Sequence, residues 1–340
     1  MGNAEVGMRN AEFNTSAICH LFSVICSPSS VLCHLSSAIC SLSSVLCHLS
    51  SVFRLVKEHQ VIPLNEIIIA VKGAGEMASA VAWRLYMSNF RKILMLETDY
   101  PLAVRREVSF CEAVHEGEKE VEKVRAVRVE KPDEINPCWQ KNEIAVVVDP
   151  QWQTIKALKP EVIVDAVLAK KNLGTHVNEA PLVIGLGPGF YAGKDVHLVI
   201  ETNRGHNLGI IITSGEAEPN TGTPGAIGGF TEERVLRAPG AGKFQSVRNI
   251  GDCVNKNEML GSVAGIEVRA RIAGVLRGLI RPNSQVTQGL KIGDIDPRGE
   301  VSYCFTISDK ARAIGGSVLE AILRSYNCAP PGSTVGGDEK

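Results

Sequence analysis

The sequence predicts an α/β protein with a mostly parallel sheet, followed by a small all-β region. Three observations support this prediction. A short apolar strand runs into a glycine turn and a helix from residue 66 onward, which is the pattern of a β-α-β unit. Further short strands that end in polar, glycine-rich loops follow up to residue 212. Beyond residue 240 the chain matches itself after a shift of 32 residues, which indicates two copies of one small β unit.

Composition and charge exclude several function classes. Lys plus Arg number 36 and Asp plus Glu number 37, so the net charge is −1 and predicts no affinity for nucleic acid or an anionic membrane. Hydrophobic residues make up 44% of the chain and charged residues 21%, as in globular proteins. No apolar run reaches the roughly 18 residues that a membrane span needs. The cysteines after residue 60 form no C-x-x-C pair, which predicts a reduced, cytoplasmic protein without a metal site.

Residues 1–60 differ from the rest of the chain because they contain an exact seven-residue repeat. Cysteine recurs within variants of Leu-Ser-Ser-Val-Ile-Cys-His at Cys19, Cys26, Cys33, Cys40 and Cys47. A coiled coil would place charges beside its apolar seam and a zinc site would pair its ligands, and the repeat does neither. Tandem copies of the DNA string CTGTCAT encode this repeat when read through three frames. We therefore interpret residues 1–60 as mistranslated or disordered and expect the true start near residues 52–61.

Residues 61–170 predict a Rossmann-like domain. The apolar run 66–71 indicates a buried parallel strand, a helical pattern follows it, and the run 92–97 indicates a second strand. The turn after the first strand fits the pattern G-x-G-x-x-A at three positions, namely Gly73, Gly75 and Ala78. Further strands are predicted at 123–129, 143–148 and 161–167.

The glycine turn is a candidate cofactor site. Its glycines let the backbone approach a phosphate group at the N-terminus of the helix. Glu97 closes the second strand 24 residues after Gly73, where an acid would bind a ribose hydroxyl. The same turn also serves plain helix–strand packing, and Glu76 within it would repel a pyrophosphate, so a bound dinucleotide stays open. The pair Arg105 and Arg106 fits anion binding and, equally well, a solvated helix face.

Residues 171–240 form a glycine-rich α/β region that we expect to complete this site. Strands predicted at 196–200 and 208–212 end in polar loops, and open α/β sheets bind ligands at such ends. The cofactor-binding candidates on these loops are Gly187, Gly189, Lys194, Asp195, Asn220 and Thr221.

The catalytic candidates in this region are Glu201, Arg204 and His206. They supply an acid, a fixed cation and a titratable base within six residues, a set that can bind an anion and move a proton. An ordered loop that is held by internal ion pairs is the alternative interpretation.

Residues 241–305 predict a domain that resembles the barrel-sandwich hybrid of biotinyl and lipoyl domains. The two copies of its repeat share the pattern V-x-x-[GN]-x-x-[LI]-G-x-[VI], which starts at Val254 and again at Val286. No lysine occurs between residues 257 and 290, so we expect no biotin or lipoate. A strand is expected at 266–272, and a docking role through its Arg269 and Arg271 is the remaining interpretation. Residues 306–340 predict a helix at 309–325, capped by Ser308 or Asp309, and then a disordered tail.

Several strings together resemble one bacterial family, the selenium-dependent molybdenum hydroxylase accessory (maturation) proteins. The strings are VKGAGEMASAVAWRL, RREVSFCEAV, VDAVLAKKNLGT, APLVIGLGPGFYAGKDVHLVIETNRGH and SGEAEPNTGTPG. The resemblance runs from about residue 67 to residue 325. It implies a cytoplasmic accessory factor that helps to place labile selenium or the molybdenum cofactor in a hydroxylase. Its implied partners are the apo-hydroxylase and other maturation factors, and a homo-oligomer is compatible with it.

The resemblance leaves the ligand unspecified, either molybdenum cofactor or a nucleotide, and assigns no reaction. We expect the turn 73–78, the loop 187–195 and the cluster 201–206 to face one cleft, where Lys194 and Arg204 suit a phosphate-bearing cofactor. Cys111, expected on an amphipathic helix, is a candidate selenium carrier, with plain burial as the alternative. Two other functions stay open, an NAD(P)-dependent oxidoreductase that uses Glu97 and a scaffold that docks through the C-terminal barrel.

Overall fold

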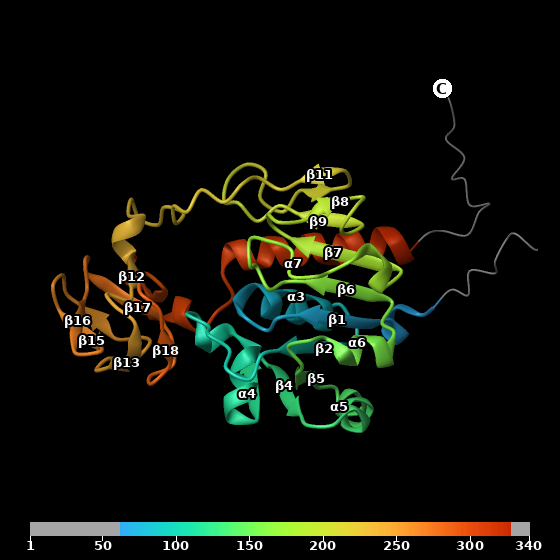
Figure 1. Cartoon of the computed structure of the whole chain (residues 1–340), viewed down its shortest axis with the longest axis horizontal. Helices are drawn as coiled ribbons and strands as arrows, with labels where there is room; N and C mark the ends of the chain where they lie inside the picture. The colour runs from blue at the N-terminus through green and yellow to red at the C-terminus, as the bar shows by residue number, and fades with distance from the viewer. Residues whose placement is uncertain (1–61, 328–340) are drawn as a thin grey trace, which may run out of the picture. The chain divides into compact units, whose positions relative to one another are not determined.

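The computed structural model describes residues 62–327, which form a mixed α/β unit around one large sheet (Figure 1). The cysteine repeat, the expected start site and the predicted tail lie outside the described residues. Within residues 62–327, no helix combines the length and the apolar composition that crossing a bilayer requires.

The large sheet has nine strands in the order β10-β9-β7-β6-β1-β2-β5-β4-β3. Neighbours from β9 to β4 run parallel, whereas β10 and β3 pair antiparallel at the two edges. The strand bounds are β1 Ile68–Lys72, β2 Lys92–Glu97, β3 Glu118–Val121, β4 Val124–Val129, β5 Ile144–Val148, β6 Val162–Asp165, β7 Leu182–Leu186, β9 Leu198–Ile200 and β10 Ile211–Ile212. A separate short pair joins β8 Tyr191–Ala192 to β11 Gly215–Glu216.

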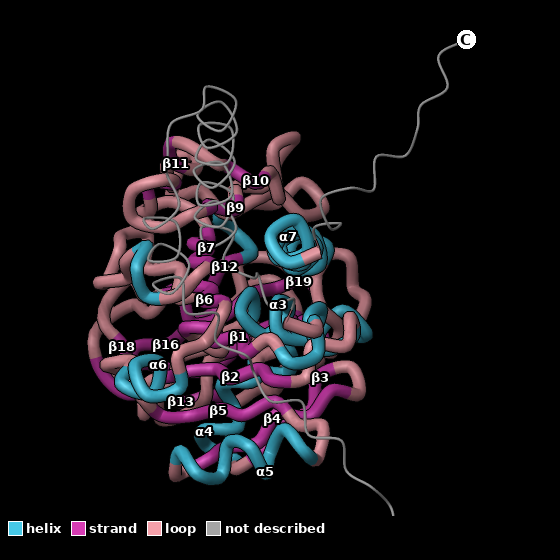
Figure 2. Tube along the Cα trace, turned by 90° about the vertical axis from the view of Figure 1, so that its right-hand side faces the viewer, coloured by secondary structure: helices cyan, strands magenta, loops and turns pink. Residues whose placement is uncertain are grey.

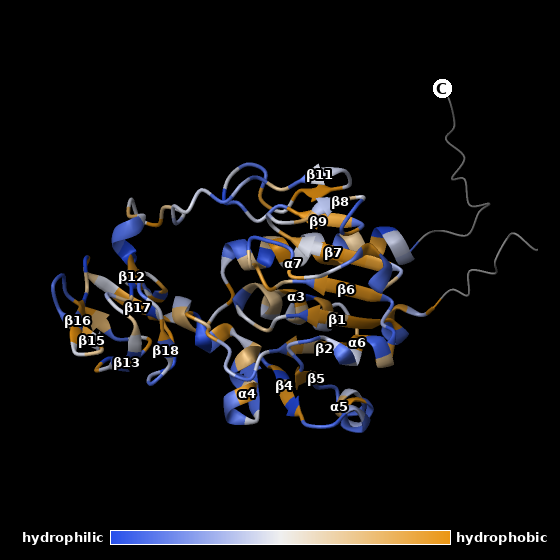
Figure 3. Ribbon diagram, viewed as in Figure 1, coloured by the Kyte–Doolittle hydropathy of each residue, from blue (hydrophilic) through white to orange (hydrophobic). Residues whose placement is uncertain are grey.

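Alternating side chains of the central strands build one core on each face of the sheet. Ile69 and Val71 of β1 belong to the core under α3 and α7, whereas Ala70 belongs to the opposite core. Figure 2 shows α3 and α7 on one side of the strands and α6 on the other. Figure 3 shows that β1, β6 and β7 are hydrophobic along their length, as strands covered on both faces are. The helix bounds are α3 Glu76–Met87, α4 Ala113–Glu116, α5 Ile135–Gln140, α6 Gln153–Leu158 and α7 Asp309–Tyr326.

Helices α3 and α7 pack closely because α7 presents a glycine at their contact. A Cβ atom at Gly315 would lie 2.9 Å from the carbonyl oxygen of Ala80. The predicted terminal helix is confirmed and is one residue longer than expected. Ser308 is its N-cap, since its side chain accepts a hydrogen bond from the Ala311 N–H group.

The C-terminal β region contains two four-stranded sheets around their own core, which holds Phe244, Leu260 and Ile292. The sheet orders are β12-β19-β17-β14 and β16-β15-β13-β18. The strand bounds are β12 Val235–Arg237, β13 Gly242–Ser246, β14 Cys253–Val254, β15 Met259–Val263, β16 Ile266–Arg269, β17 Gly274–Leu279, β18 Gln285–Val286 and β19 Lys291–Asp296.

The self-match in the sequence corresponds to equivalent strands in this region. Each copy is a two-residue strand, β14 or β18, followed by a longer strand, β15 or β19. The residues between them adopt the same left-handed backbone, with φ 70° at Asn257 and φ 80° at Gly289. The first copy begins in one sheet and ends in the other, and the second copy does so in the reverse order. The two copies therefore occupy exchanged positions in the two sheets.

Several predicted elements differ in extent from the structure. The strand expected at 208–212 contracts to β10, because Gly209 turns the chain at φ 86° and its N–H donates to the Glu201 carbonyl. The strand expected at 266–272 ends at Arg269, and the strand expected at 196–200 begins only at Leu198. Cys111 lies on a 3-10 turn rather than on the amphipathic helix that we expected.

Candidate functional site

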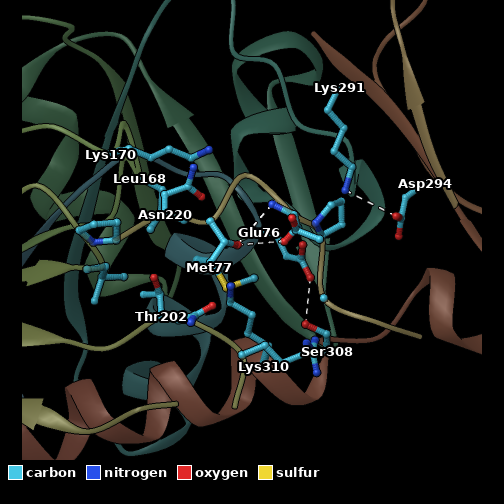
Figure 4. A pocket seen from close by; sticks show the side chains of 18 of the residues that line it. Glu76, Met77, Leu168, Lys170, Thr202, Asn220, Lys291, Asp294, Ser308 and Lys310 are labelled. Carbon is cyan, nitrogen blue, oxygen red and sulfur yellow. Dashed lines mark hydrogen bonds and ion pairs between the residues drawn. The ribbon is translucent and has the colours of Figure 1, made fainter. Parts of the chain in front are cut away.

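A cavity of about 680 Å³ lies at the carboxyl ends of the parallel strands. Met77 follows β1, Leu168 follows β6, Pro188 follows β7 and Thr202 follows β9. The chain leaves β1 toward β2 on one side and leaves β6 toward β7 on the other, so this edge contains a topological switch point. Open α/β sheets bind ligands at such points. Figure 4 shows side chains from these strand ends and from the C-terminal β region around one space.

Cationic side chains dominate the cavity lining. Three lining residues are acidic, Glu76, Glu218 and Asp294, and seven are cationic, namely Arg105, Lys170, Arg204, Arg234, Arg277, Lys291 and Lys310. Arg234 and Lys291 share the Asp294 carboxylate. The excess of cations over acids gives the cavity lining a net positive charge.

Two helix N-termini meet at the cavity. Glu76 begins α3 and Ser308 caps α7, and the Ser308 hydroxyl donates to Glu76 Oε1 at 3.0 Å. Arg105 Nη1 also donates to Glu76 Oε1, at 3.2 Å. Helix N-termini carry partial positive charge, which adds to the cationic lining. The Glu76 carboxylate, which we expected to repel a pyrophosphate, is thus paired with a cation.

The glycine turn binds its own acid. Glu97 Oε2 accepts a hydrogen bond from the Ala74 N–H at 2.8 Å, and Glu97 Oε1 accepts one from the Thr98 N–H at 2.8 Å. Gly73 adopts φ 90°, and a Cβ there would lie 3.3 Å from the Ala166 carbonyl oxygen. The turn therefore packs against β6, and a backbone donor that a phosphate would use is already engaged. Gly73, Gly75, Ala78 and Glu97 are absent from the cavity lining, although Glu76 and Met77 between them belong to it.

The loop after β7 contributes less to the cavity than the sequence predicted. Gly187 adopts φ 75° and packs so closely on Thr202 that a Cβ there would overlap the threonine hydroxyl. A Cβ at Gly189 would lie 2.7 Å from Lys171 Cα. Asp195 Oδ2 accepts from the Tyr191 N–H at 2.9 Å, and Lys194 is exposed. Neither Lys194 nor Asp195 lines the cavity, because both belong to the turn between β8 and β9.

The structure does not bring Glu201, Arg204 and His206 together as an acid–base group. Glu201 is buried. Its carboxylate accepts hydrogen bonds from the backbone N–H groups of Asn203, at 2.6 Å, and of Glu218, at 2.7 Å, so it connects these two loop segments. Arg204 does line the cavity, whereas His206 is exposed and does not. Glu201 therefore fits the alternative interpretation, in which internal contacts hold an ordered loop.

Arg204 forms an ion pair with Asp309 at 2.7 Å, and this contact joins the loop after β9 to the first turn of α7. The hydrogen bond from Arg204 lowers the pKa of Asp309 to about 2. Asn220 and Thr221, two predicted binding residues, also line the cavity. Of the segments expected to share one cleft, the structure thus brings together parts of the β1 turn, the β7 loop, Arg204 and the 220–221 loop.

The sequence missed five cationic residues of the cavity, of which Lys170 lies in the loop after β6. Arg234, Arg277 and Lys291 come from the C-terminal β region, and Lys310 comes from the first turn of α7. Burial lowers the pKa of Lys310, and the nearby charge of Arg204 lowers it further. These residues carry no local motif, since a lone cation in a strand or helix reads as a surface residue. Only the fold brings them to the sheet edge.

A second group of buried ionisable residues lies at the ends of β1 and β6. Lys72, at the end of β1, is fully buried and donates to Glu179 Oε2 at 2.6 Å and Thr175 Oγ1 at 2.7 Å. Thr175 in turn donates to Asp165 Oδ2 at 2.5 Å, and the Trp152 ring lies 3.8 Å from the Lys72 ammonium. These contacts fasten the segment 175–179 to the ends of β1 and β6.

Cys111 is almost fully buried, at 1% exposure. Burial raises the pKa of its thiol well above the ordinary value, and the charge of Glu97 raises it further. A neutral, buried thiol is a poor nucleophile, so the packing alternative describes this residue better than the selenium carrier does. Among residues 62–327, no three His, Cys, Asp or Glu side chains group in a way that could hold a metal ion.

One curated protein shares clear sequence similarity with this chain. Over 261 residues the chain is 48% identical to the uncharacterized protein YqeB of Escherichia coli (strain K12). The match covers 77% of this chain and 48% of YqeB, so the chain spans about half the length of that relative. No family model matches the sequence.

Solved structures give only distant similarity. An aspartoacylase family protein from Mesorhizobium loti is 11% identical, with a TM-score of 0.22 over 67% of this chain and 84% of that one. A structure described as TcdA (CsdL) is 12% identical, with a TM-score of 0.28 over 82% of this chain and 95% of that one. TM-scores of this size do not establish a shared fold.

Proposed function

We propose that this protein is a cytoplasmic accessory factor for the maturation of selenium-dependent molybdenum hydroxylases, and that it binds an anionic, phosphate-bearing ligand in the cavity at the sheet edge. The sequence strings between residues 67 and 325 support the family. The observation that carries the ligand class is the cavity, with seven cationic side chains against three acidic ones. The apo-hydroxylase and other maturation factors are its partners in this proposal.

The cavity has the donors that the molybdenum cofactor, as cargo, requires. This cofactor carries a phosphate group, which cations and N–H donors bind. The Nε atoms of Arg105 and Arg277 are buried without a hydrogen-bond partner, and both side chains line the cavity. The cationic side chains of the lining would hold the phosphate, while Asn220 and Thr221 offer neutral polar contacts. A nucleotide presents the same phosphate chemistry and is the alternative ligand.

The finer architecture is part of the proposal. The parallel sheet with its glycine turn supports a Rossmann-like domain, and the exchanged repeat copies support a barrel-sandwich hybrid at 241–305. In this interpretation the C-terminal region has a share in the ligand site, because Arg234, Arg277 and Lys291 line the cavity. The docking role predicted for Arg269 and Arg271 stays a prediction. Arg269 is paired with Glu267 at 2.6 Å, and Arg271 contacts the Glu232 carbonyl at 3.4 Å.

Ligand-induced stabilisation of the full chain tests this proposal. A ligand that binds only the folded state raises stability by about 2.7 kcal/mol at a hundredfold excess over Kd. We expect the thermal midpoint to rise with molybdenum cofactor, and an apo-hydroxylase to be retained on the immobilised chain. A rise with NAD or NADP alone, abolished by Glu97→Ala, would instead establish the oxidoreductase alternative. Absence of both hydroxylase capture and cofactor binding would refute the proposal.

A further inference from the structure

Arg277 is a buried cation with little compensation from the protein. It lies on β17 with 7% of its surface exposed and lines the cavity. Its acidic neighbour Asp296 is 3.6 Å away, beyond hydrogen-bond distance. Arg298 already engages both oxygens of that carboxylate, at 2.9 Å and 2.7 Å. Within residues 62–327, the Arg277 guanidinium makes no hydrogen bond and its Nε is buried, which is costly for a charged group.

A second buried arginine lies next to it. Arg105 is 5% exposed, and its Nη2 donates to the carbonyl oxygens of Tyr303 and Thr306 at 2.8 Å and 2.9 Å. Its Nε is buried and has no partner. Arg105 and Arg277 line the same cavity, so their like charges oppose each other. Burial lowers the pKa of Arg105; the Glu76 carboxylate opposes this effect, and the charge of Arg277 adds to it.

Lys310 is a third cation of the same cavity lining. Its side chain is half-buried in the first turn of α7, and no carboxylate among the described residues lies within ion-pair distance of its ammonium. Figure 4 shows Lys310 beside Ser308, whose hydroxyl donates to Glu76. Two arginine side chains with unused donors, one unpaired lysine and a helix N-terminus therefore line one cavity.

We propose that Arg277, Arg105 and Lys310 form an oxyanion subsite that receives a phosphomonoester or diphosphate group. A phosphate offers three or more acceptor oxygens and up to two negative charges, whereas a carboxylate offers two oxygens and one charge. The number of unused donors and the three cations match the phosphate. The bound group satisfies the orphaned guanidinium donors and removes the repulsion between the arginines. This inference deepens the proposed function, since it assigns the phosphate to Arg277 of β17, Lys310 of α7 and Arg105 in the segment after β2 rather than to the glycine turn.

Calorimetric titration of the full chain at fixed ionic strength tests the subsite. The probes are inorganic phosphate, pyrophosphate and AMP, with acetate as the carboxylate control. We expect pyrophosphate to bind and acetate not to bind. In Arg277→Met the Kd for pyrophosphate should rise at least about tenfold, because charge-assisted hydrogen bonds are lost. The matched control is Arg248→Met, which removes an exposed arginine paired with Glu258, and it should bind like the wild type.

Thermal unfolding without ligand separates binding from structure. Arg298 keeps Asp296 paired, so Arg277→Met should unfold at the wild-type midpoint or above it. If that variant fails to fold, Lys310→Met is the second variant to test. We expect it to bind pyrophosphate severalfold more weakly than the wild type. Wild-type affinity for pyrophosphate in both variants, or no pyrophosphate binding by the wild type, would overturn the subsite. Capture of a hydroxylase in that case leaves the accessory function standing, whereas Arg277-dependent pyrophosphate binding without hydroxylase capture supports the subsite alone.

Discussion

The Ser308 hydroxyl donates to Glu76 Oε1 at 3.0 Å, and this bond joins the first turns of α3 and α7. The two residues are 232 positions apart in the chain, yet they place two helix N-termini at one edge of the sheet. Arg105 donates to the same carboxylate oxygen. Glu76 therefore connects three segments of the cavity wall, and the acid that we expected to repel a pyrophosphate is paired with Arg105.

Alanine substitutions at two adjacent glycines of α7 should have opposite effects on stability. A Cβ at Gly315 would press on the Ala80 carbonyl oxygen at 2.9 Å and on Arg84 Cβ at 3.2 Å, whereas a Cβ at Gly316 would meet nothing within 4 Å. We expect Gly315→Ala to lower the unfolding free energy by about 1–3 kcal/mol through overpacking. Gly316→Ala should raise it by about 0.5–1 kcal/mol through helix propensity. Urea unfolding measures both, and equal effects of the two substitutions would contradict the close helix contact.

Glu97 gives a prediction that separates a structural role from a cofactor role. Its carboxylate accepts from the N–H groups of Ala74 and Thr98. We expect Glu97→Ala to lower the unfolding free energy by about 1–3 kcal/mol, because the part-buried Ala74 N–H loses its acceptor. Glu97→Gln keeps one acceptor oxygen and should cost less. Pyrophosphate affinity should not change in either variant, and an unchanged stability with lost NAD(P) binding would show that the acid serves a dinucleotide instead.

Residue patterns predicted the architecture well where local chemistry decides it. The strand 92–97 coincides with β2, since its apolar residues are covered on both faces of the sheet. The helix at 309–325 was found through its cap and its spacing. The repeat located equivalent strands because the left-handed positions Asn257 and Gly289 recur in both copies.

The candidate site was predicted only in part, because its charges come from distant segments. Arg204, Asn220 and Thr221 were found on polar loops after strands, and these residues do line the cavity. Arg277 lies within a buried strand and Lys310 within a helix, so neither stood out locally. Glycine turns were assigned to phosphate binding, but Gly187 instead packs on Thr202. A glycine pattern does not distinguish close approach of a ligand from close approach of the protein itself.

Replacing Lys72 by a neutral residue should destabilise the protein strongly. Its ammonium contacts Glu179 and Thr175 in a fully buried position, and Asp165 lies behind Thr175. Lys72→Met leaves the carboxylates without their cation, which should cost about 3–5 kcal/mol. The control is Lys92→Met, at a strand lysine whose ion pair with Glu66 is largely solvated and worth less than about 1 kcal/mol. Chemical denaturation compares the two variants, and similar losses in both would mean that the buried network contributes little.

The Arg204–Asp309 ion pair predicts a coupling between acid stability and anion binding. The folded-state pKa of Asp309 is depressed from 3.8 to about 2, so the stabilisation is present above pH 3.8 and is lost as the pH falls toward 2. Asp309→Asn should remove this part of the pH dependence, and the effect is small because the Asp309 side chain is 76% exposed.

The same substitution frees the Arg204 guanidinium at the cavity, so pyrophosphate affinity near pH 7 should rise severalfold. Glu320→Gln, which breaks an exposed pair with Arg324 on the same helix, should leave the affinity unchanged. Urea unfolding between pH 2 and 5 and calorimetry at pH 7 measure the two effects. An unaltered pyrophosphate affinity in Asp309→Asn would mean that Arg204 does not contact the anion.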